Sequence, residues 1–354
     1  MLIGYAPRAG TQTPPDVRIR PLAPMRRAGD NRSKLAFLAH SAIRMGLLFW
    51  QLTAALVKER PDTILVQNPP GFPTLAAAWI ARLIAGSRVI VDWHNYGFTI
   101  LALRLGERHP IVRLHAWYEF LAGRLCGRYH LCVSEAMRVD LAAKHGINAT
   151  VLYDRPVGEP AARTPNAKLT AVCPAGWTSD EDMSLLLEAI EFLAPATVAA
   201  WEFHLTGDGP LRASLEPRID ALRQRGVDIH TGFLPEQSYR KLFAGADLGI
   251  SLHRSSSGLD LAMKVVDLFQ HGVPVCALDY GGAVTEQIQP GRTGFLFTDA
   301  SELSQTLTGI TRDPPMLDAM RAGVLAAWSR PGWRDSWRRA LREIGALTDL
   351  QTNL

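Results

Sequence analysis

Short apolar segments alternate along this chain with longer segments that have helical periodicity. The apolar segments lack a polar residue at every second position, which is typical of parallel strands buried on both faces of a sheet. Parallel strands need crossover helices, and the intervening segments supply them. The sequence therefore predicts an α/β fold. In the first half we expect strands at 63–67, 88–92, 130–133 and 150–153, and helices at 33–58, 74–85, 110–124 and 135–144.

The same alternation begins again after a Pro- and Ala-rich stretch at 155–167, which we interpret as a linker. A chain of 354 residues exceeds what one hydrophobic core usually serves. We therefore expect one domain in 1–160, a second in 161–330, and a terminal helix in 331–354 that returns to the first. The second half predicts strands at 169–173, 202–206, 227–231, 248–252 and 273–278, helices at 180–193, 237–244 and 263–270, and a helical segment 316–347 broken at 331–332.

Positive charge is concentrated at the start of the chain. Residues 1–60 hold ten Lys and Arg against three Asp and Glu, whereas the net charge of the whole chain is only +4. This excess indicates either attraction to anionic lipid or phosphate, or a set of solvated arginines. The apolar run 46–57 is too short to span a bilayer. Its helix is expected to pack in the first domain or, as a close alternative, to lie partly in a membrane interface.

Cysteine spacing gives no sign of a metal site or a disulfide framework. Cys126, Cys132, Cys173 and Cys276 form no C-x-x-C pair, and no His cluster has zinc-finger spacing. We expect four buried thiols in a reducing compartment. No signal peptide is recognised at the start of the sequence.

Polar clusters follow several predicted strands at their carboxyl ends, where parallel sheets bind ligands. Two such clusters, 68–74 and 92–97, belong to the first domain, and three, 176–182, 207–210 and 253–260, belong to the second. Their distribution predicts a ligand cleft between the two domains.

The cluster Ser255-Ser256-Ser257-Gly258-Leu259-Asp260 precedes the predicted helix 263–270. Small residues and the free N–H groups of a helix start favour a diphosphate, and Lys264 in the first turn can neutralise it. Asp267, about two helical turns beyond Asp260, could hold a ribose diol. An equally acceptable interpretation is a Ser/Asp helix cap followed by ordinary surface charge.

Several segments together resemble the chitobiosyldiphosphodolichol β-mannosyltransferase family, in the order in which that family has them. They are Gln67-Asn-Pro-Pro-Gly71, Val91-Asp-Trp-His-Asn-Tyr-Gly97, Trp117-Tyr-Glu119, Cys132-Val-Ser-Glu-Ala-Met137, Trp177-Thr-Ser-Asp-Glu-Asp182 and the segment Leu252–Asp267. The resemblance covers about residues 60–300. It implies a GT-B fold of two Rossmann-like domains and a hexosyltransferase, a β-1,4-mannosyltransferase, that uses GDP-mannose with inversion. The implied acceptor is two N-acetylglucosamines on a polyprenyl diphosphate, and the implied place is the cytoplasmic face of a membrane, with no nucleic-acid partner.

The resemblance and the fold it implies assign candidate residues to both sides of the cleft. The donor side comprises Gly176, Trp177, Thr178, Gly207, Gly209, Phe233, Leu234, His253, Arg254, Ser255, Ser256, Ser257, Gly258, Leu259, Asp260, Lys264 and Asp267. The acceptor side comprises Asn68, Pro69, Pro70, Asn95, Tyr96 and Glu119.

An inverting transfer needs a base for the acceptor hydroxyl and positive charge for the departing diphosphate. We expect His94 to be the base, or else a residue that positions a substrate. Asp92 could orient His94, act as base itself or bond the backbone of its loop. Lys264, with Arg254, is expected to stabilise the leaving group. Glu119 is a weaker candidate base.

The sequence departs from the family pattern at three places. A strand, Gly/Arg loop and helix that precede the region matching Leu2–Tyr5 in the family are absent from it, as is the family's amino-terminal anchor. Ala262 stands where a Pro is common. The missing unit leaves open a non-catalytic nucleotide-binding subunit, and a few pocket contacts could select another nucleotide sugar or acceptor.

The D-x-D pattern of Asp180 and Asp182 marks metal sites in another glycosyltransferase fold. Here it follows Ser179 at a predicted helix start, where capping and the helix dipole explain it. We therefore expect no catalytic metal and no cofactor.

Overall fold

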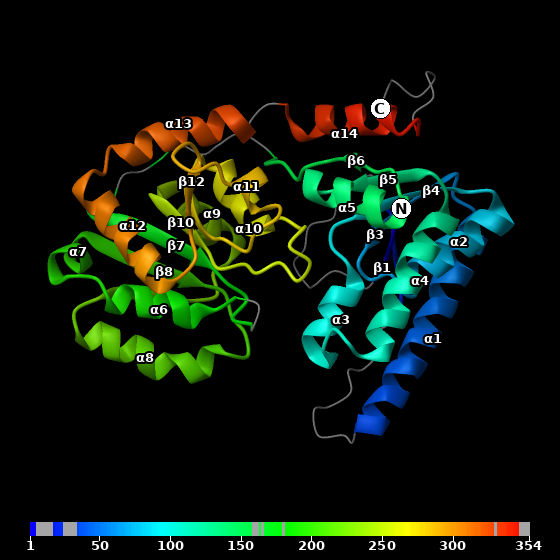
Figure 1. Ribbon diagram of the computed structural model, residues 1–354, viewed down its shortest axis with the longest axis horizontal. Helices are drawn as coiled ribbons and strands as arrows, with labels where there is room; N and C mark the ends of the chain where they lie inside the picture. Colours follow the sequence, from blue (N-terminus) through cyan, green and yellow to red (C-terminus); the bar gives the residue numbers. More distant parts are fainter. Residues whose placement is uncertain are drawn as a thin grey trace. The chain divides into compact units, whose positions relative to one another are not determined.

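The computed structural model describes residues 1–4, 17–23, 34–157, 163, 166–178, 181–328 and 331–346, with the backbone alone over 34–41. The chain forms two compact units. Unit 1 comprises Met1–Cys132, Arg138–Thr150 and Leu341–Leu354; unit 2 comprises Val133–Met137 and Val151–Ala340. Each unit contains its own parallel sheet (Figure 1).

Unit 1 is built on a four-stranded sheet in the order β3-β4-β5-β6, in which β3, β4 and β5 are parallel. A separate pair, β1 and β2, is also parallel. The long helix α1 packs against α2, and α2 against α4. The elements are β1 (Leu2–Gly4), β2 (Ile19–Pro21), α1 (Lys34–Glu59), β3 (Thr63–Asn68), α2 (Thr74–Ala85), β4 (Arg88–Trp93), α3 (Gly97–Leu105), α4 (Pro110–Cys126), β5 (Tyr129–Cys132), α5 (Glu135–His145) and β6 (Thr150–Val151).

Unit 2 contains a six-stranded parallel sheet in the order β12-β11-β10-β7-β8-β9. Its elements are β7 (Leu169–Pro174), α6 (Met183–Glu191), α7 (Pro195–Ala200), β8 (Trp201–Thr206), α8 (Arg212–Gln224), β9 (Asp228–Gly232), α9 (Glu236–Gly245), β10 (Leu248–Ser251), α10 (Met263–Gln270), β11 (Val275–Leu278), α11 (Val284–Gln287), β12 (Gly294–Phe297), α12 (Ala300–Arg312), α13 (Met316–Trp328) and most of α14 (Trp333–Glu343). The last residues of α14, from Leu341, belong to unit 1.

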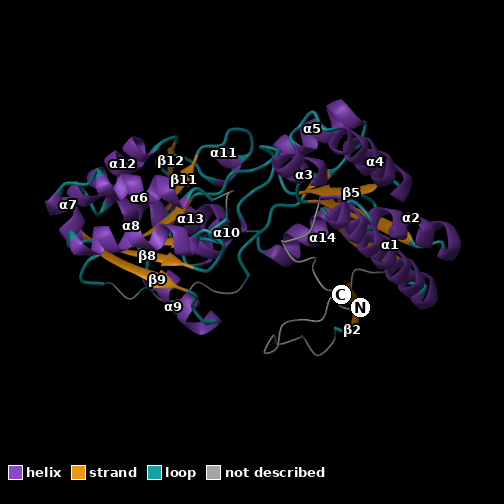
Figure 2. Ribbon diagram, turned by 90° about the horizontal axis from the view of Figure 1, so that it is seen from below, coloured by secondary structure: helices purple, strands orange, loops and turns teal. Residues whose placement is uncertain are grey.

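Alternate residues of the strands in unit 2 pack into two different cores. Ala171 and Cys173 of β7 join the core beneath α6 and α12, whereas Val172 joins the core beneath α9 and α10. Figure 2 shows helices on both faces of this sheet. Both faces are thus covered, which explains why these strands are apolar throughout.

Most predicted elements lie within a few residues of the observed ones, and the helices 74–85 and 263–270 match them. The helix predicted from Asp180 begins instead at Met183, because Glu181 is paired in an isolated bridge with His253. Ser179 and Asp180 lie outside the described residues. Asp182 occupies the N-cap position but makes no side-chain capping bond, so the capping explanation was wrong for it.

All four cysteines are free and buried, as expected. Burial raises the pKa of the Cys126 thiol to about 12. Burial, followed by the charge of Glu181, raises the pKa of Cys173 to about 12 as well. Cys126 and Cys173 are therefore protonated, poorly nucleophilic core residues.

Candidate active site

The strand order of unit 2 reverses direction between β7 and β10, which are neighbours in the sheet although two strands, β8 and β9, separate them in sequence. In parallel sheets, ligands bind beyond the carboxyl ends of the strands at such a switch point. The loops that follow β7 and β10 are 175–182 and 252–262. Both are segments that the sequence analysis selected.

A pocket of about 160 Å³ lies at these strand ends. Four predicted donor-side residues line it: Gly207, Phe233, Leu234 and Lys264. Phe233 is 71% exposed, so its ring is available to stack on a ligand. The remaining lining residues are Pro174, Ala175, Thr206 and Tyr239.

Lys264 reaches this pocket from the first turn of α10 and forms a salt bridge with Glu181. The other carboxylate oxygen of Glu181 accepts a hydrogen bond from the backbone N–H of Gly176. Glu181 therefore links Lys264 to the loop after β7. Neighbouring residues of this loop were predicted as site residues from the sequence, but Glu181 was not, because its partner Lys264 is 83 positions away.

The serine segment folds into a half-buried loop held by its own side chains. Ser255 Oγ accepts a hydrogen bond from Gly258 N at 2.7 Å and also bonds Asp260. The other oxygen of Asp260 lies 3.1 Å from His253 Nε2. The N-cap residue of α10 is Ala262, which makes no side-chain capping bond. The alternative interpretation of Ser and Asp as caps of this helix is therefore wrong.

Asp260 lies before the helix, so the spacing of two helical turns from Asp260 to Asp267 does not apply. Asp267 lies one turn beyond Lys264 on α10. Burial and the charge of Asp267 raise the pKa of Tyr239, which lines the pocket. Asp267 therefore lies near Tyr239, a residue of the pocket lining.

Gly207 and Gly209 allow two loops to pack closely. A Cβ at Gly207, where φ is +101°, would lie 1.9 Å from the carbonyl oxygen of Ala175. A Cβ at Gly209 would lie 1.9 Å from that of Gly176. Trp177, in the same loop, has φ of +50° and is fully buried in the core. Its side chain thus packs in the interior, and its indole does not line the pocket.

In unit 1, a buried carboxylate joins the loops that follow β3 and β4. Glu119 of α4 has no exposed surface. It accepts hydrogen bonds from Asn68 Nδ2 at 2.6 Å, Gly97 N at 2.7 Å and Phe98 N at 3.2 Å. Asn68 is also fully buried and donates to the carbonyl of Asn95 at 3.1 Å. This geometry joins the two loops and leaves the carboxylate of Glu119 without surface that a ligand could contact.

Asp92 and His94 form a pair at the end of β4. The carboxylate of Asp92 lies 2.9 Å from His94 Nε2, and both side chains are partly exposed. The backbone N–H of His94 donates to the carbonyl of Asn68 at 2.8 Å, which fixes the loop. A carboxylate in this place holds the imidazole in one orientation.

Tyr96 is buried, and its hydroxyl donates to Asp140 at 2.9 Å. Burial and this bond raise its pKa, so Tyr96 stays protonated. Among the other predicted acceptor-side residues, Pro69 and Asn95 are half-buried and Pro70 is exposed.

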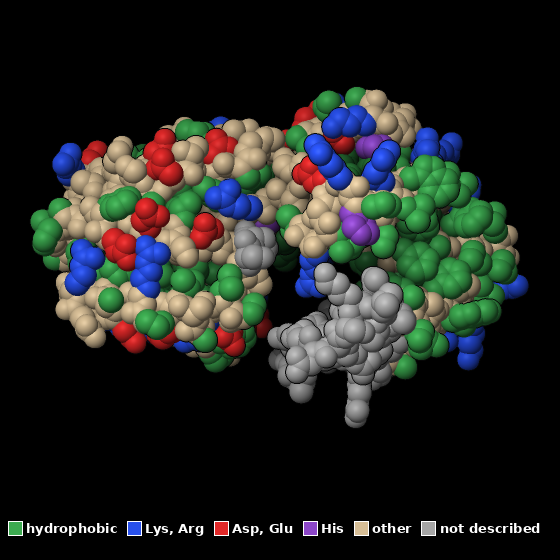
Figure 3. Space-filling model, turned by 60° about the horizontal axis from the view of Figure 1, so that its bottom comes forward, with side chains coloured by type: hydrophobic (Ala, Val, Ile, Leu, Met, Phe, Trp, Pro, Cys, Tyr) green, Lys and Arg blue, Asp and Glu red, His purple; other side chains and the backbone are tan. Residues whose placement is uncertain are grey.

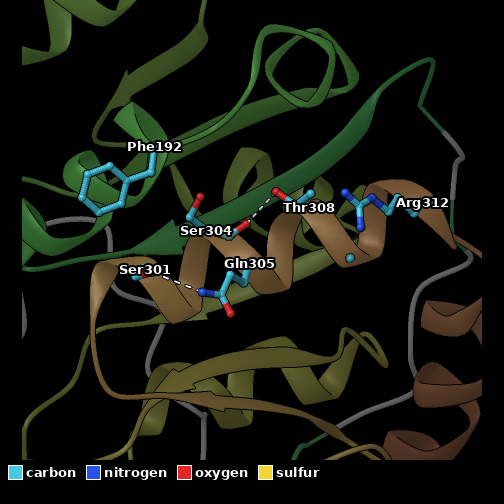
Figure 4. A pocket seen from close by; sticks show the side chains of 7 residues that line it. Phe192, Ser301, Ser304, Gln305, Thr308 and Arg312 are labelled. Carbon is cyan, nitrogen blue, oxygen red and sulfur yellow. Dashed lines mark hydrogen bonds between the residues drawn. The ribbon is translucent and has the colours of Figure 1, made fainter.

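A larger hollow of about 530 Å³ lies along α12 (Figure 4). Its lining includes Phe192, Ser304, Gln305 and Arg312. None of the predicted site residues lines it, so size alone does not identify the site.

Comparison with known proteins identifies the family of the chain. Residues 168–313 match the family model described as glycosyl transferases group 1, and residues 2–153 match the glycosyl transferase 4-like domain. The chitobiosyldiphosphodolichol beta-mannosyltransferase of Mus musculus is 32% identical, over 92% of this chain and 78% of its own length. That of Arthroderma benhamiae is 36% identical, over 86% of this chain and 76% of its own. This chain belongs to the same family.

Two solved structures show the fold of this β-mannosyltransferase family member. HepE of Anabaena in complex with UDP has a TM-score of 0.64 at 16% identity, and the match covers 83% of this chain and 82% of HepE. Sucrose-phosphate synthase of Thermosynechococcus elongatus has a TM-score of 0.65 at 14% identity, covering 96% and 86%. The fold is GT-B, and the chain is a hexosyltransferase, as the sequence predicted. Within the described residues, no helix has the length and hydropathy needed to cross a bilayer.

Proposed function

We propose that this protein transfers mannose from GDP-mannose to two N-acetylglucosamines carried on a prenyl diphosphate, with inversion at the anomeric carbon. The observation that carries this proposal is the likeness, at 32–36% identity over most of the chain, to proteins named chitobiosyldiphosphodolichol beta-mannosyltransferase. The mannose of GDP-mannose is α-linked, and the names of these relatives specify a β-linked product. A single displacement with inversion connects the two.

Unit 2 binds the donor in this proposal. The guanine stacks on the exposed ring of Phe233 at one end of the 160 Å³ pocket, and the diphosphate is bound by Lys264. The half-buried serine loop, exposed Arg254 and the start of α10 contribute further donors to the phosphates. Asp267 accepts from the ribose hydroxyls.

Unit 1 supplies the base. As the acceptor hydroxyl oxygen attacks the anomeric carbon, the bond to the GDP oxygen breaks and the hydroxyl proton passes to His94. The neighbouring Asp92 stabilises the imidazolium that forms. Glu119 and Asn68 act indirectly, by fixing the loop that carries His94.

We propose that unit 1 also lies against a membrane that holds the lipid-linked acceptor. Ile43, Leu47 and Trp50 share one face of α1 and are 64%, 50% and 70% exposed. Figure 3 shows hydrophobic side chains gathered over the surface of this unit. By contrast, Arg18 and Arg20 both pair with Glu59, so one of their two positive charges is already compensated. Docking is therefore driven by apolar contact more than by the basic residues described.

Flotation with phosphatidylcholine vesicles, with and without phosphatidylserine, tests this docking. Trp50→Ser should reduce the vesicle-bound fraction severalfold, whereas Phe192→Ser, which removes an exposed aromatic from unit 2, should leave it unchanged. Equal binding of the two variants contradicts docking through α1.

We place the enzyme on the cytoplasmic face, where its buried thiols stay reduced and nucleotide sugar is available.

A UDP-sugar donor is the second candidate. One relative, 31% identical over 88% of this chain, is named UDP-glycosyltransferase TURAN and comes from Arabidopsis thaliana. A donor with uracil in place of guanine requires only different contacts to the nucleobase near Phe233, whereas the contacts to the diphosphate stay the same.

A donor panel separates these candidates. The purified full chain is mixed with chitobiosyl diphosphate on a short prenyl chain and with GDP-mannose, UDP-glucose or UDP-N-acetylglucosamine in turn. We expect product from GDP-mannose alone, with a β-anomeric coupling by NMR. Product from a UDP-sugar only would reverse the donor assignment. Tight GDP binding without turnover would instead indicate a non-catalytic subunit.

We further propose that Lys264 and Arg254 replace a metal ion at the diphosphate. Activity that is lost with EDTA and regained with Mn²⁺ but not with Zn²⁺ contradicts this.

A further inference from the structure

Two histidines and two carboxylates lie together on one face of β8 and β9. The strands are parallel, and their register pairs Glu202 with Asp228 and His204 with His230. Side chains two residues apart in a strand share a face, so all four project to the same side. The intervening Trp201, Phe203 and Leu205 are buried on the opposite face.

The side-chain atoms of three of these residues converge. The imidazoles of His204 and His230 stack at 4.6 Å between centroids with 20° between their planes. Glu202 Oε1 lies 3.5 Å from His204 Nε2. One ligand atom each of Glu202, His204 and His230 lies within 4.8 Å of the others. This spacing allows all three atoms to face one ion.

The surroundings orient two of these side chains. Thr170 Oγ1 donates to Glu202 Oε1 at 2.6 Å. Asp228 Oδ1 lies 3.0 Å from His230 Nε2, and the other oxygen of Asp228 pairs with Lys168 at 2.8 Å. Because Lys168 compensates the charge of Asp228, Glu202 is the carboxylate suited to bind a cation. Asp228 takes the place of the carboxylate that commonly orients a metal-binding histidine.

We propose that Glu202, His204 and His230 bind a zinc ion, with water completing a tetrahedral shell. Two imidazoles and one carboxylate are a donor set that zinc accepts, whereas calcium and magnesium prefer oxygen ligands alone. The site is independent of the sugar-transfer chemistry proposed above, and no step of that reaction passes through it.

The metal would join β9, the edge strand of the sheet, to its neighbour β8. These strands end at Thr206 and Gly232, and the residues that follow, Gly207 and Phe233, line the nucleotide pocket. The backbone N–H of Gly207 already bonds the carbonyl of Gly232 at 3.0 Å. Zinc therefore stabilises the strands that carry one wall of this pocket.

Zinc binding by the metal-free full chain, measured by competition with a chromophoric chelator and without donor or acceptor, tests the proposal. We expect one zinc per chain and a rise in Tm of roughly 5–10 °C at a hundredfold excess over Kd. His204→Gln and His230→Gln should each weaken binding at least tenfold, and Glu202→Gln should weaken it less. His109→Asn is the matched control, because it removes a histidine of unit 1 and keeps a side chain able to cap α4.

Cobalt provides a measurement that needs no variant. Co²⁺ bound by two imidazoles, a carboxylate and water should give the intense visible absorption of a tetrahedral complex, and zinc should displace it. Zinc affinity that is the same in the His204, His230 and His109 variants overturns the proposal. So does the weak spectrum of octahedral Co²⁺. Because no sugar substrate is present, neither result depends on the proposed transferase activity.

Discussion

The two units hold their candidate site residues in different ways. In unit 1, the loops after β3 and β4 are joined by Glu119, a carboxylate with no exposed surface and three N–H partners. In unit 2, Lys264 pairs with Glu181, and the side chain of Lys264 is still 35% exposed. The first arrangement has no room for another ligand, whereas the second places a cation where an incoming anion can compete for it.

This difference follows from the partners of each charge. A buried carboxylate that accepts several backbone and amide hydrogen bonds is costly to disturb, because each donor would lose its only acceptor. A lysine can exchange one anionic partner for another at little cost, since its three donors rotate freely. We therefore infer that unit 1 is organised before substrate binds, whereas Lys264 changes partner on binding.

Substitution of Glu119 tests whether this carboxylate organises unit 1, and it should have the largest effect on stability. Glu119→Ala removes the acceptor of three N–H groups, those of buried Asn68 and half-buried Gly97 and Phe98, which should destabilise unit 1 by about 3 kcal/mol and lower its Tm by roughly 10 °C. Turnover should fall with it, because the loop bearing His94 loses its support. Thermal unfolding followed by circular dichroism measures the change.

Gly71→Ala is a second probe of the same network. A Cβ at Gly71 would lie 3.1 Å from Asn68 Oδ1 and 3.2 Å from Glu119 Cγ, so it should destabilise unit 1 in the same direction by less. Unchanged stability and activity in both variants would show that unit 1 is not organised by Glu119.

Substitution of His94 tests whether the organised loop serves the chemical step. His94→Ala should reduce kcat by roughly 10²–10⁴-fold, the usual contribution of a general base, with the Kd for GDP unchanged. Asp92→Asn should reduce kcat less, because the imidazole remains. Steady-state kinetics and GDP titration give the two quantities. A large loss of GDP affinity in His94→Ala would assign this residue to donor binding instead.

Features that depend on residues adjacent in the sequence could be predicted. The buried strands were predicted from their uninterrupted apolar residues. The helix predicted at 135–144 corresponds to α5, and at its start Ser134 Oγ accepts from Met137 N at 3.0 Å. The clusters at strand ends follow from the same pattern, because all parallel strands of a sheet end at one edge. By contrast, α8, which contains Pro217, and α12 were not predicted.

Partners distant in sequence could not be predicted. Glu119 lies 51 positions from Asn68, and Glu181 lies 83 from Lys264. The family resemblance assigned Glu119 to the acceptor side, but it gives no measure of how deeply Glu119 is buried. The acidic residues 180–182 were interpreted as a helix cap, so a salt bridge to Lys264 was not expected. Only the fold shows that one of these carboxylates is enclosed by backbone donors and the other is paired with a lysine.

Lys264→Ala tests whether Lys264 of unit 2 exchanges its partner Glu181 for the diphosphate of the donor. The Kd for GDP should rise by roughly 10–100-fold, because a charge-assisted hydrogen bond contributes about 1.5–3 kcal/mol. Lys264→Arg, which keeps the charge and loses the compact ammonium, should fall between this variant and the natural protein. Calorimetric titration with GDP measures both. An unchanged Kd in Lys264→Ala would remove Lys264 from the donor site.

Glu181→Gln should have the smallest effect and the opposite sign. The amide oxygen can still accept from Gly176 N, whereas the negative charge that competes with the diphosphate for Lys264 is removed. We expect GDP to bind roughly threefold to tenfold more tightly, equivalent to about 0.7–1.4 kcal/mol. Weaker binding would mean that Glu181 is needed to aim Lys264 at the donor.

The double variant Lys264→Ala with Glu181→Gln separates two causes of that gain. If Glu181 acts by occupying Lys264, its replacement should change nothing once the lysine is gone, and the two effects are not additive. If Glu181 instead repels the diphosphate directly, the gain should persist in the Lys264→Ala background. Only the first result supports a lysine that changes partner when the donor binds, because the second is also expected of a fixed cation beside an unrelated negative charge.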